Sequence, residues 1–269
     1  MPRVRVGEHE LWYETEGTGD PVLLLMGLGG DHHGWALQRP ALAARHRVVL
    51  LDSRDAGASD EARAPYGIAD LAGDALGVMD HLGIQRFHVV GASMGGAIAQ
   101  HLALQAPTRV ASLVLVATWG RTDAFLRAVL ASWRLLVERL APAELLAVLA
   151  PWAFTSRFFA APPPDVLALQ AALAERGPLK SVAAYQRQVD ACLAHDVLDL
   201  LPLLTTPTLV LVGEEDILTP PRYARAIAAS LFASEVAVVA AAGHACFLET
   251  PKPVTDRIVH FLAKRPLWT

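Results

Sequence analysis

Apolar residues recur along the chain either in short continuous runs or in longer stretches with helical spacing. Near the start, residues 3–6 and 10–16 alternate apolar and polar positions on either side of Gly7, which predicts an antiparallel hairpin. Later runs are apolar at nearly every position, as expected of strands buried on both faces of a parallel sheet. These runs are Val22–Met26, Val48–Leu51, Phe87–Val90, Leu113–Ala117, Leu209–Val212 and Val236–Ala240.

Stretches of helical length and spacing separate these runs. They are Tyr66–Leu82, Met94–Gln105, Pro220–Ser230 and Val254–Ala263. Because strands alternate with helices, the sequence predicts an α/β fold, a doubly wound and mostly parallel sheet of about eight strands.

The alternation is interrupted once, between residues 120 and 202. This segment has no strand pattern and consists of Ala- and Leu-rich helical stretches separated by prolines, with room for about four or five helices. We expect an all-helical cap over residues 120–202, inserted into a core formed by residues 1–119 and 203–269. The alternative is that these helices only cover one face of the sheet.

Composition narrows the class of protein. The chain has 269 residues, 53% hydrophobic and 19% charged, with a formal net charge of −4. This composition supports a large core, excludes a disordered chain and argues against nucleic-acid binding. Cys192 and Cys246 are too few for a disulfide framework, and the sequence has neither a secretory signal nor a membrane-spanning pattern. We expect a cytoplasmic protein without a nucleic-acid or membrane partner; the oligomeric state is left open.

The strongest chemical motif is Gly-x-Ser-x-Gly from Gly91 to Gly95, placed between a predicted strand and a predicted helix. That context is the one a nucleophilic serine requires, because a tight strand-to-helix turn exposes its hydroxyl and tolerates only small neighbours. The helix that follows directs its N-terminus at the reacting carbonyl. We therefore predict that Ser93 is the nucleophile.

A serine hydroxyl needs a base, and the base needs an acid to orient it. His244 follows the predicted strand Val236–Ala240, at the sheet edge where Ser93 lies, whereas the other nine histidines lie in a strand, in helices or in connecting segments. Asp216 follows the strand before and is the preferred acid. Glu214 and Glu215 on the same loop are the nearest alternatives; Asp123 is a weaker one.

The reaction also needs two N–H donors for the developing oxyanion. One is expected from Met94, the residue after the nucleophile. The other is expected from the glycine-rich loop that follows the first buried strand, with Leu28 preferred and Gly29 next. A merely flexible turn is the alternative interpretation of this loop.

These motifs resemble the α/β-hydrolase superfamily over nearly the whole chain. The loop Leu-Leu-Met-Gly-Leu-Gly-Gly is similar to the family's oxyanion loop, with Met26 in place of the usual histidine. The turn from Asp52 to Ser59 is similar to the family's Asp-x-Arg-Gly-x-Gly-x-Ser, with Asp55 in place of the first glycine. The combination resembles bacterial carboxylesterases and methylesterases, and with Trp35 also the 3-oxoadipate enol-lactonases.

Individual residues exclude or weaken some branches of that superfamily. Ser93 excludes the haloalkane dehalogenases and epoxide hydrolases, whose nucleophile is aspartate, and Ala92 disfavours the carbon–carbon bond hydrolases. Asp31-His32-His33 lacks the ligand spacing of the metal-dependent lactonases. No dinucleotide-binding or P-loop motif is present, so we expect neither cofactor nor metal.

The sequence thus predicts a serine hydrolase that cleaves a small carboxylic ester or lactone through an acyl-enzyme. Gly27, Gly29, Trp35 and Trp119 are candidate substrate contacts, although Trp119 is equally compatible with simple packing where the cap begins. Two alternatives stay open: a cofactor-free perhydrolase or haloperoxidase with the same triad, and a ligand receptor that retains the triad.

Overall fold

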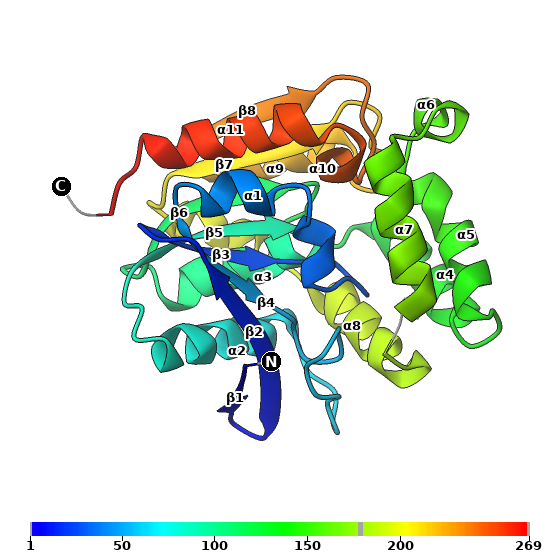
Figure 1. The fold of residues 1–269 in the computed structure, drawn as a ribbon, viewed down its shortest axis with the longest axis horizontal. Coiled ribbons are helices and arrows are strands. Elements are labelled where there is room, and N and C mark those ends of the chain that lie inside the picture. The colour runs from blue at the N-terminus through cyan, green and yellow to red at the C-terminus, as the bar shows by residue number, and fades with distance from the viewer. Residues whose placement is uncertain (1, 177–179, 268–269) are drawn as a thin grey trace.

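The computed structural model describes residues 2–176 and 180–267. At its centre is an eight-stranded sheet with the strand order β1-β2-β4-β3-β5-β6-β7-β8 (Figure 1). The strands are β1 (Arg3–Val6), β2 (His9–Glu16), β3 (Pro21–Leu25), β4 (Arg47–Leu51), β5 (Phe87–Ala92), β6 (Val110–Val116), β7 (Thr208–Gly213) and β8 (Ser234–Val239).

Strand directions match the expected fold class. β1 and β2 form the predicted hairpin, β2 also pairs antiparallel with β4, and all the remaining pairings are parallel. The doubly wound, mostly parallel sheet is confirmed. β6 begins at Val110, earlier than the apolar run indicated, because polar Ser112 lies inside the strand, where its buried hydroxyl pairs with Nδ1 of His88 at 2.7 Å.

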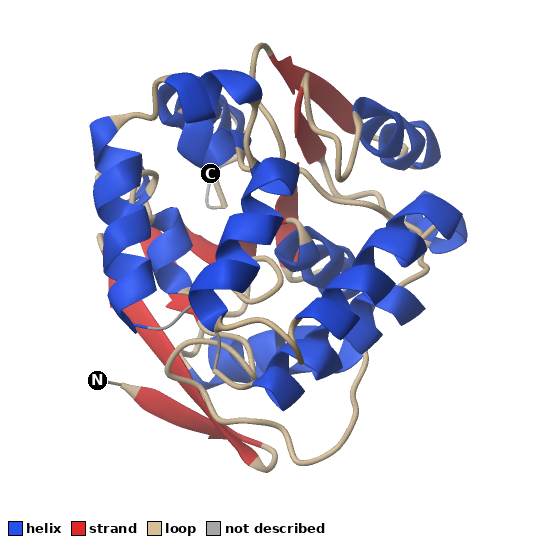
Figure 2. Ribbon diagram, turned by 90° about the vertical axis from the view of Figure 1, so that its right-hand side faces the viewer, coloured by secondary structure: helices blue, strands red, loops and turns tan. Residues whose placement is uncertain are grey.

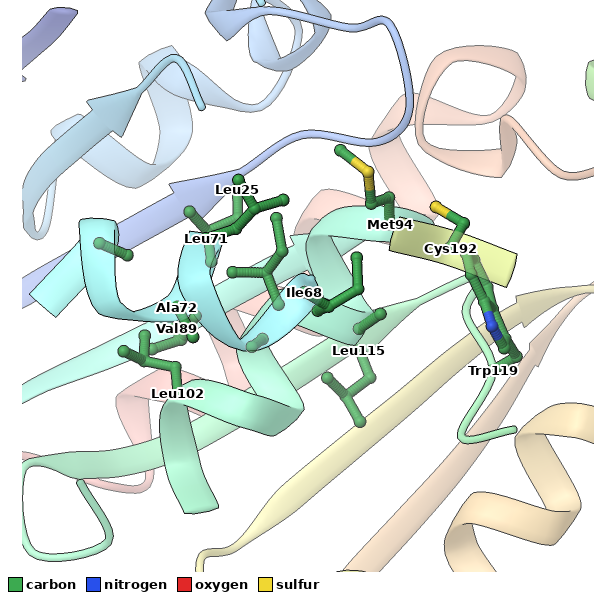
Figure 3. Packing of buried hydrophobic residues seen from close by; sticks show 14 of the residues in the cluster. Leu25, Ile68, Leu71, Ala72, Val89, Met94, Leu102, Leu115, Trp119 and Cys192 are labelled. Atoms are coloured by element: carbon green, nitrogen blue, oxygen red, sulfur yellow. The ribbon is translucent and has the colours of Figure 1, made fainter. Parts of the chain in front are cut away.

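Helices cover both faces of the sheet. α2 (Ile68–His81), α3 (Met94–Gln105) and α9 (Pro221–Ser230) share one apolar cluster with one face. Figure 3 shows part of it, with Leu71 of α2 packed near Leu25 of β3. The short α1 (Arg39–Ala43) and α10 (Cys246–Glu249), together with α11 (Pro251–Ala263), pack in a second cluster with the other face. No helix in the described ranges is long and apolar enough to cross a membrane.

Between β6 and β7 the described chain contains only helices and loops, apart from one isolated bridge between Arg121 and Asp196. These are α4 (Ala124–Leu136), α5 (Pro142–Ala153), α6 (Ser156–Ala160), α7 (Pro164–Arg176), α8 (Val182–Ala194) and the 3-10 helix η2 (Leu198–Leu203). We call α4–α8 the cap helices. They lie together beyond one end of the sheet, and Figure 2 looks onto the side that they occupy.

Candidate active site

Ser93 lies at the turn between β5 and α3 with φ of +54° and ψ of −119°, a conformation that L residues rarely adopt. The residues two positions before and after it must be glycine. A Cβ on Gly91 would lie 2.2 Å from the carbonyl oxygen of Gly95, and a Cβ on Gly95 would lie 2.1 Å from that of Leu25. The motif therefore folds as a tight turn that lifts the serine from the end of β5.

Three side chains from separate loops form a hydrogen-bonded chain at this sheet edge. Nε2 of His244 lies 2.9 Å from Oγ of Ser93, and Nδ1 of the same ring lies 2.9 Å from Oδ2 of Asp216. His244 follows β8, and Asp216 follows β7. The hydroxyl of Thr219 donates to Oδ2 of Asp216 at 2.8 Å and lies 3.0 Å from Nδ1 of His244. Such a chain can carry the hydroxyl proton from serine to imidazole.

Asp216 is 3% exposed and well supplied with donors. The backbone N–H groups of Leu218 and Thr219 donate to its Oδ1 at 2.9 and 2.8 Å. Burial by itself would raise the pKa of this carboxyl, but the interaction with His244 and the hydrogen bonds from Thr219 outweigh burial and lower it. The carboxylate is therefore held in its charged form, facing the imidazole.

The alternative acids lie elsewhere. Glu214 and Glu215 are exposed, and Glu214 accepts a bond from the backbone N–H of Ala241 at 3.2 Å. Asp123 caps α4 and accepts a hydrogen bond from the Tyr223 hydroxyl at 2.6 Å. Among the acids considered from the sequence, the structure brings only Asp216 within hydrogen-bond distance of the His244 ring in the described chain.

The glycine-rich loop after β3 forms a tight turn, closed by a bond from the Gly30 N–H to the Gly27 carbonyl at 3.0 Å. Gly27 faces the serine, since a Cβ there would lie 3.0 Å from Cβ of Ser93. The Gly29 N–H already donates to Oε1 of Gln188 at 2.8 Å. Within the described residues, the Leu28 and Met94 N–H groups have no protein acceptor, which leaves them free to bind an oxyanion.

Beside Ser93 and His244 lies a pocket of about 180 Å³ with a mostly apolar lining. The cap helices contribute Trp133, Leu149, Trp152, Ala153 and Tyr185, and the core contributes Met26, Gly27, Leu28, Gly30, Ala92, Leu218, Ala245 and Phe247. The rings of Trp133 and Trp152 meet edge to face, with centroids 6.3 Å apart. A wider cleft of about 560 Å³ adjoins the acid loop and shares Trp152 with the pocket.

The structure does not bring Trp35, Trp119 or Gly29 into the described lining of this pocket. Trp35 is fully buried in the second cluster, with its ring centroid 5.4 Å from that of Phe247. Trp119 is buried in the first cluster, as Figure 3 shows, and its indole N–H donates to Thr122 at 2.8 Å. For Trp119 the packing alternative therefore describes its position.

The aromatic lining from the cap helices was not named from the sequence. Trp133 and Trp152 lie in apolar helical stretches, which the sequence predicts to cover either the sheet or a pocket. The local sequence pattern does not show which of their side chains line the pocket beside Ser93. Tyr185 had no local signal at all. It is 3% exposed, burial raises the pKa of its phenol, and its hydroxyl makes no hydrogen bond in the described chain.

The group Asp31, His32 and His33 is the one set of metal-ligating side chains found together among the described residues. Nδ1 of His32 lies 2.9 Å from Oδ1 of the fully buried Asp52, and Nδ1 of His33 lies 2.9 Å from Oδ1 of Asp31. The His32 ring also stacks on Trp12, with centroids 3.8 Å apart. His32 is thus held against Asp52 and Trp12, while His33 pairs with Asp31.

Comparison with known proteins agrees with the fold. Residues 20–251 match the family described as alpha/beta hydrolase fold. "Putative carbamate hydrolase RutD" of Azorhizobium caulinodans is 31% identical, over 97% of this chain and 98% of the relative. A thermophilic esterase from Thermogutta terrifontis is 32% identical with a TM-score of 0.86, covering 98% of this chain and 99% of its own. The enol-lactonase from Burkholderia xenovorans is 27% identical with a TM-score of 0.89, covering 97% and 100%.

The chain therefore belongs to the α/β-hydrolase family. Its reaction class is that of a hydrolase, and the resemblance drawn from the sequence is confirmed at the level of the family.

Proposed function

We propose that this protein is a serine hydrolase that cleaves small carboxylic esters or lactones through an acyl-enzyme. The observation that carries the proposal is the hydrogen-bonded chain Ser93–His244–Asp216, open to an apolar pocket. The names of the esterase and enol-lactonase relatives support the same substrate class.

In the first half of the reaction, Oγ of Ser93 attacks the carbonyl carbon while Nε2 of His244 takes the hydroxyl proton. The negative charge that develops on the carbonyl oxygen is stabilised by the Leu28 N–H group, on the loop after β3, and by the Met94 N–H group, at the N-terminus of α3. The tetrahedral intermediate then collapses, and His244 returns the proton to the departing alkoxide. Asp216 stabilises the imidazolium throughout.

In the second half, water attacks the acyl-enzyme as His244 removes its proton. The second tetrahedral intermediate collapses as His244 passes this proton to Oγ of Ser93, so the carboxylic acid leaves and the hydroxyl is restored. The acyl group occupies the pocket of about 180 Å³. This pocket is smaller than the roughly 300–1,000 Å³ that encloses drug-sized ligands, which favours short acyl groups.

The test is hydrolysis of a matched panel: p-nitrophenyl esters from acetate to decanoate, γ-lactones, N-acyl homoserine lactones and an aryl carbamate. We expect turnover of short esters or lactones, together with labelling of Ser93 by a fluorophosphonate, read as a mass shift of its peptide. Ser93→Ala is expected to abolish both. Ser132→Ala, which removes an exposed serine of α4, is the control and is expected to retain both.

Other results would replace the proposal. Turnover of the carbamate alone would move the substrate class to carbamates, and peroxide-dependent oxidation with no hydrolysis would favour a perhydrolase. If Ser93 is labelled but each site releases no more than one equivalent of product, the protein is a receptor rather than an enzyme.

A further inference from the structure

Gln188 is a fully buried amide on the cap helix α8, and it contacts two loops of the core. Its Oε1 accepts the Gly29 N–H at 2.8 Å, and its Nε2 donates to the Arg54 carbonyl at 3.3 Å. A buried amide is costly unless its polar atoms are paired, so these bonds define where the side chain can lie. Gln188 therefore bridges the glycine-rich loop after β3 and the loop after β4.

The bond to Gly29 falls on the peptide unit that joins Leu28 to Gly29. Gly29 has φ of +69°, and the turn is closed from Gly30 to Gly27. Because a peptide unit is rigid, holding this N–H toward α8 restricts the backbone torsions on both sides of it. The Leu28 N–H lies one peptide unit earlier, so its direction depends on the same restraint.

The side of α8 that carries Gln188 is itself anchored. Arg187 makes a two-point ion pair with Asp55, at 2.8 and 2.7 Å, and the Asp55 side chain is fully buried. The preceding residue, Arg54, is held through its guanidinium by Asp74, with two bonds of 2.6 Å. The first ion pair fixes α8 against the core and the second holds Arg54, so Gln188 is well placed to hold the glycine-rich loop after β3.

We propose that Gln188 is a positioning residue for the oxyanion hole: it holds the Gly27–Gly30 turn so that the Leu28 N–H faces the reacting carbonyl. The proposal rests on the function proposed above. It gives the cap a part in the chemical step, in addition to covering the pocket. Since an oxyanion donor acts mainly in the transition state, the effect falls on kcat rather than on KM.

The test compares three variants of the full-length enzyme. Gln188→Met keeps the length of the side chain but removes the acceptor, whereas Gln188→Glu keeps an oxygen opposite the Gly29 N–H. Asp190→Asn is the matched control, because it removes the exposed ion pair to Arg134 on another side of α8. We expect Gln188→Met to lower kcat about ten- to hundredfold with KM nearly unchanged, less than the loss of a donor itself. Gln188→Glu should recover most of kcat, and Asp190→Asn should be normal.

A second readout does not depend on turnover. Hydrogen exchange of a peptide spanning residues 27–30, followed by mass spectrometry, is expected to accelerate in Gln188→Met and not in Asp190→Asn. If no Ser93-dependent hydrolysis is found, the proposed function fails, whereas the exchange data still report whether Gln188 holds the turn.

Three results would overturn the inference. One is unchanged kcat in a folded Gln188→Met protein, and another is a rise in KM at constant kcat, which would make Gln188 a pocket-shaping residue. The third is an equal loss of kcat in Asp190→Asn, which would assign the effect to the stability of α8. If Gln188→Met fails to fold, Gln188→Glu provides the test. A low kcat in Gln188→Glu, with normal hydrogen exchange of residues 27–30, would also overturn the inference, because the turn would be held without supporting kcat.

Discussion

Arg187 and Asp55 form an ion pair that joins the cap to the core across 132 residues of sequence. Asp55 has a φ of +68°, in the left-handed region that glycine adopts most readily. The Ala62 N–H also donates to Asp55 at 2.8 Å. Glycine would adopt this backbone with little strain, but it could not make the charged contact to Arg187 of α8 that Asp55 makes.

Removing one partner of this pair is expected to be costly. Arg187→Met leaves the buried Asp55 carboxylate without its counter-ion, and we expect a loss of about 3 to 5 kcal/mol in the free energy of unfolding. Asp55→Asn combined with Arg187→Met is expected to lose less than the sum of the single changes. Denaturant titration of the four proteins measures the coupling. Strict additivity would contradict a direct interaction.

The acid can be identified by exchanging carboxylate for amide along one loop. Asp216→Asn is expected to lower kcat about 10³- to 10⁴-fold, because the amide favours the wrong imidazole tautomer and cannot stabilise the imidazolium. Glu214→Gln and Glu215→Gln change exposed residues of that loop and should remain within about twofold of the unmodified enzyme. Steady-state kinetics with one short ester identifies the acid. If Glu215→Gln is inactive while Asp216→Asn stays active, the acid is Glu215 and not Asp216.

We expect the paired indoles of the pocket, Trp133 and Trp152, to limit the length of the acyl group. We expect kcat/KM to rise about fourfold per methylene, from about 0.8 kcal/mol of burial each, until the chain meets Trp133 and Trp152. Trp152→Ala should move the optimum to longer chains and leave the rate with acetate nearly unchanged. A panel of esters from acetate to decanoate measures the shift. An optimum that stays in place would mean that these rings do not bound the acyl site.

Buried histidines predict acid sensitivity of the fold. Burial lowers the pKa of His88 to about 4, whereas an unfolded histidine titrates near about 6.5. Between these values the unfolded chain binds the extra proton, so stability falls as the pH falls from about 6.5 to about 4. The full loss of unfolding free energy is on the order of 3 kcal/mol per histidine. Burial also lowers the pKa of His195 to about 4, so His195 adds a similar dependence on pH.

His88→Gln can retain the bond to Ser112 and removes the titrating group. Its unfolding free energy, followed by denaturant titration from pH 7 to pH 4, should decline less steeply than that of the unmodified protein. His260→Gln changes an exposed histidine and serves as the control. Parallel curves for all three proteins would show that His88 does not titrate on unfolding.

A chelator is expected to leave hydrolysis unchanged. The imidazoles of His32 and His33 already pair with carboxylates, and neither residue lines the described pocket. Activity measured before and after prolonged dialysis against EDTA provides the comparison. Loss of activity that zinc restores would make Asp31, His32 and His33 a metal site.

Local chemistry made the region around Ser93 predictable. Gly91 is required by a close contact with the Gly95 carbonyl inside the motif, whereas Gly95 is required by its contact with Leu25 of β3; the turn can still be recognised from the sequence because the motif Gly-x-Ser-x-Gly stands between a strand and a helix. His244 and Asp216 could be selected because the loops after parallel strands meet at one sheet edge. Their hydrogen-bonded geometry matches that expectation, while their catalytic roles stay a prediction.

Contacts across long sequence distances were the part that could not be predicted. Gln188 reaches Gly29 across 159 residues, and the position of α8 depends on how the cap helices pack on the core. Nothing in the local pattern of α8 distinguishes Gln188 or Tyr185 from solvent-facing polar residues. Trp35 illustrates the converse error, since an aromatic residue near the active-site loop was expected in the pocket but packs against Phe247 in the core.

The positive φ of Ser93 places backbone strain on the residue that we propose as the nucleophile. Conformations of this kind cost of order 1–3 kcal/mol for an L residue, and glycine adopts them with little strain. Glycine at position 93 would therefore relieve this strain, but it would also remove the proposed nucleophile. Because the proposed reaction depends on its hydroxyl, Ser93 is a poor target for stabilising design despite its strained backbone.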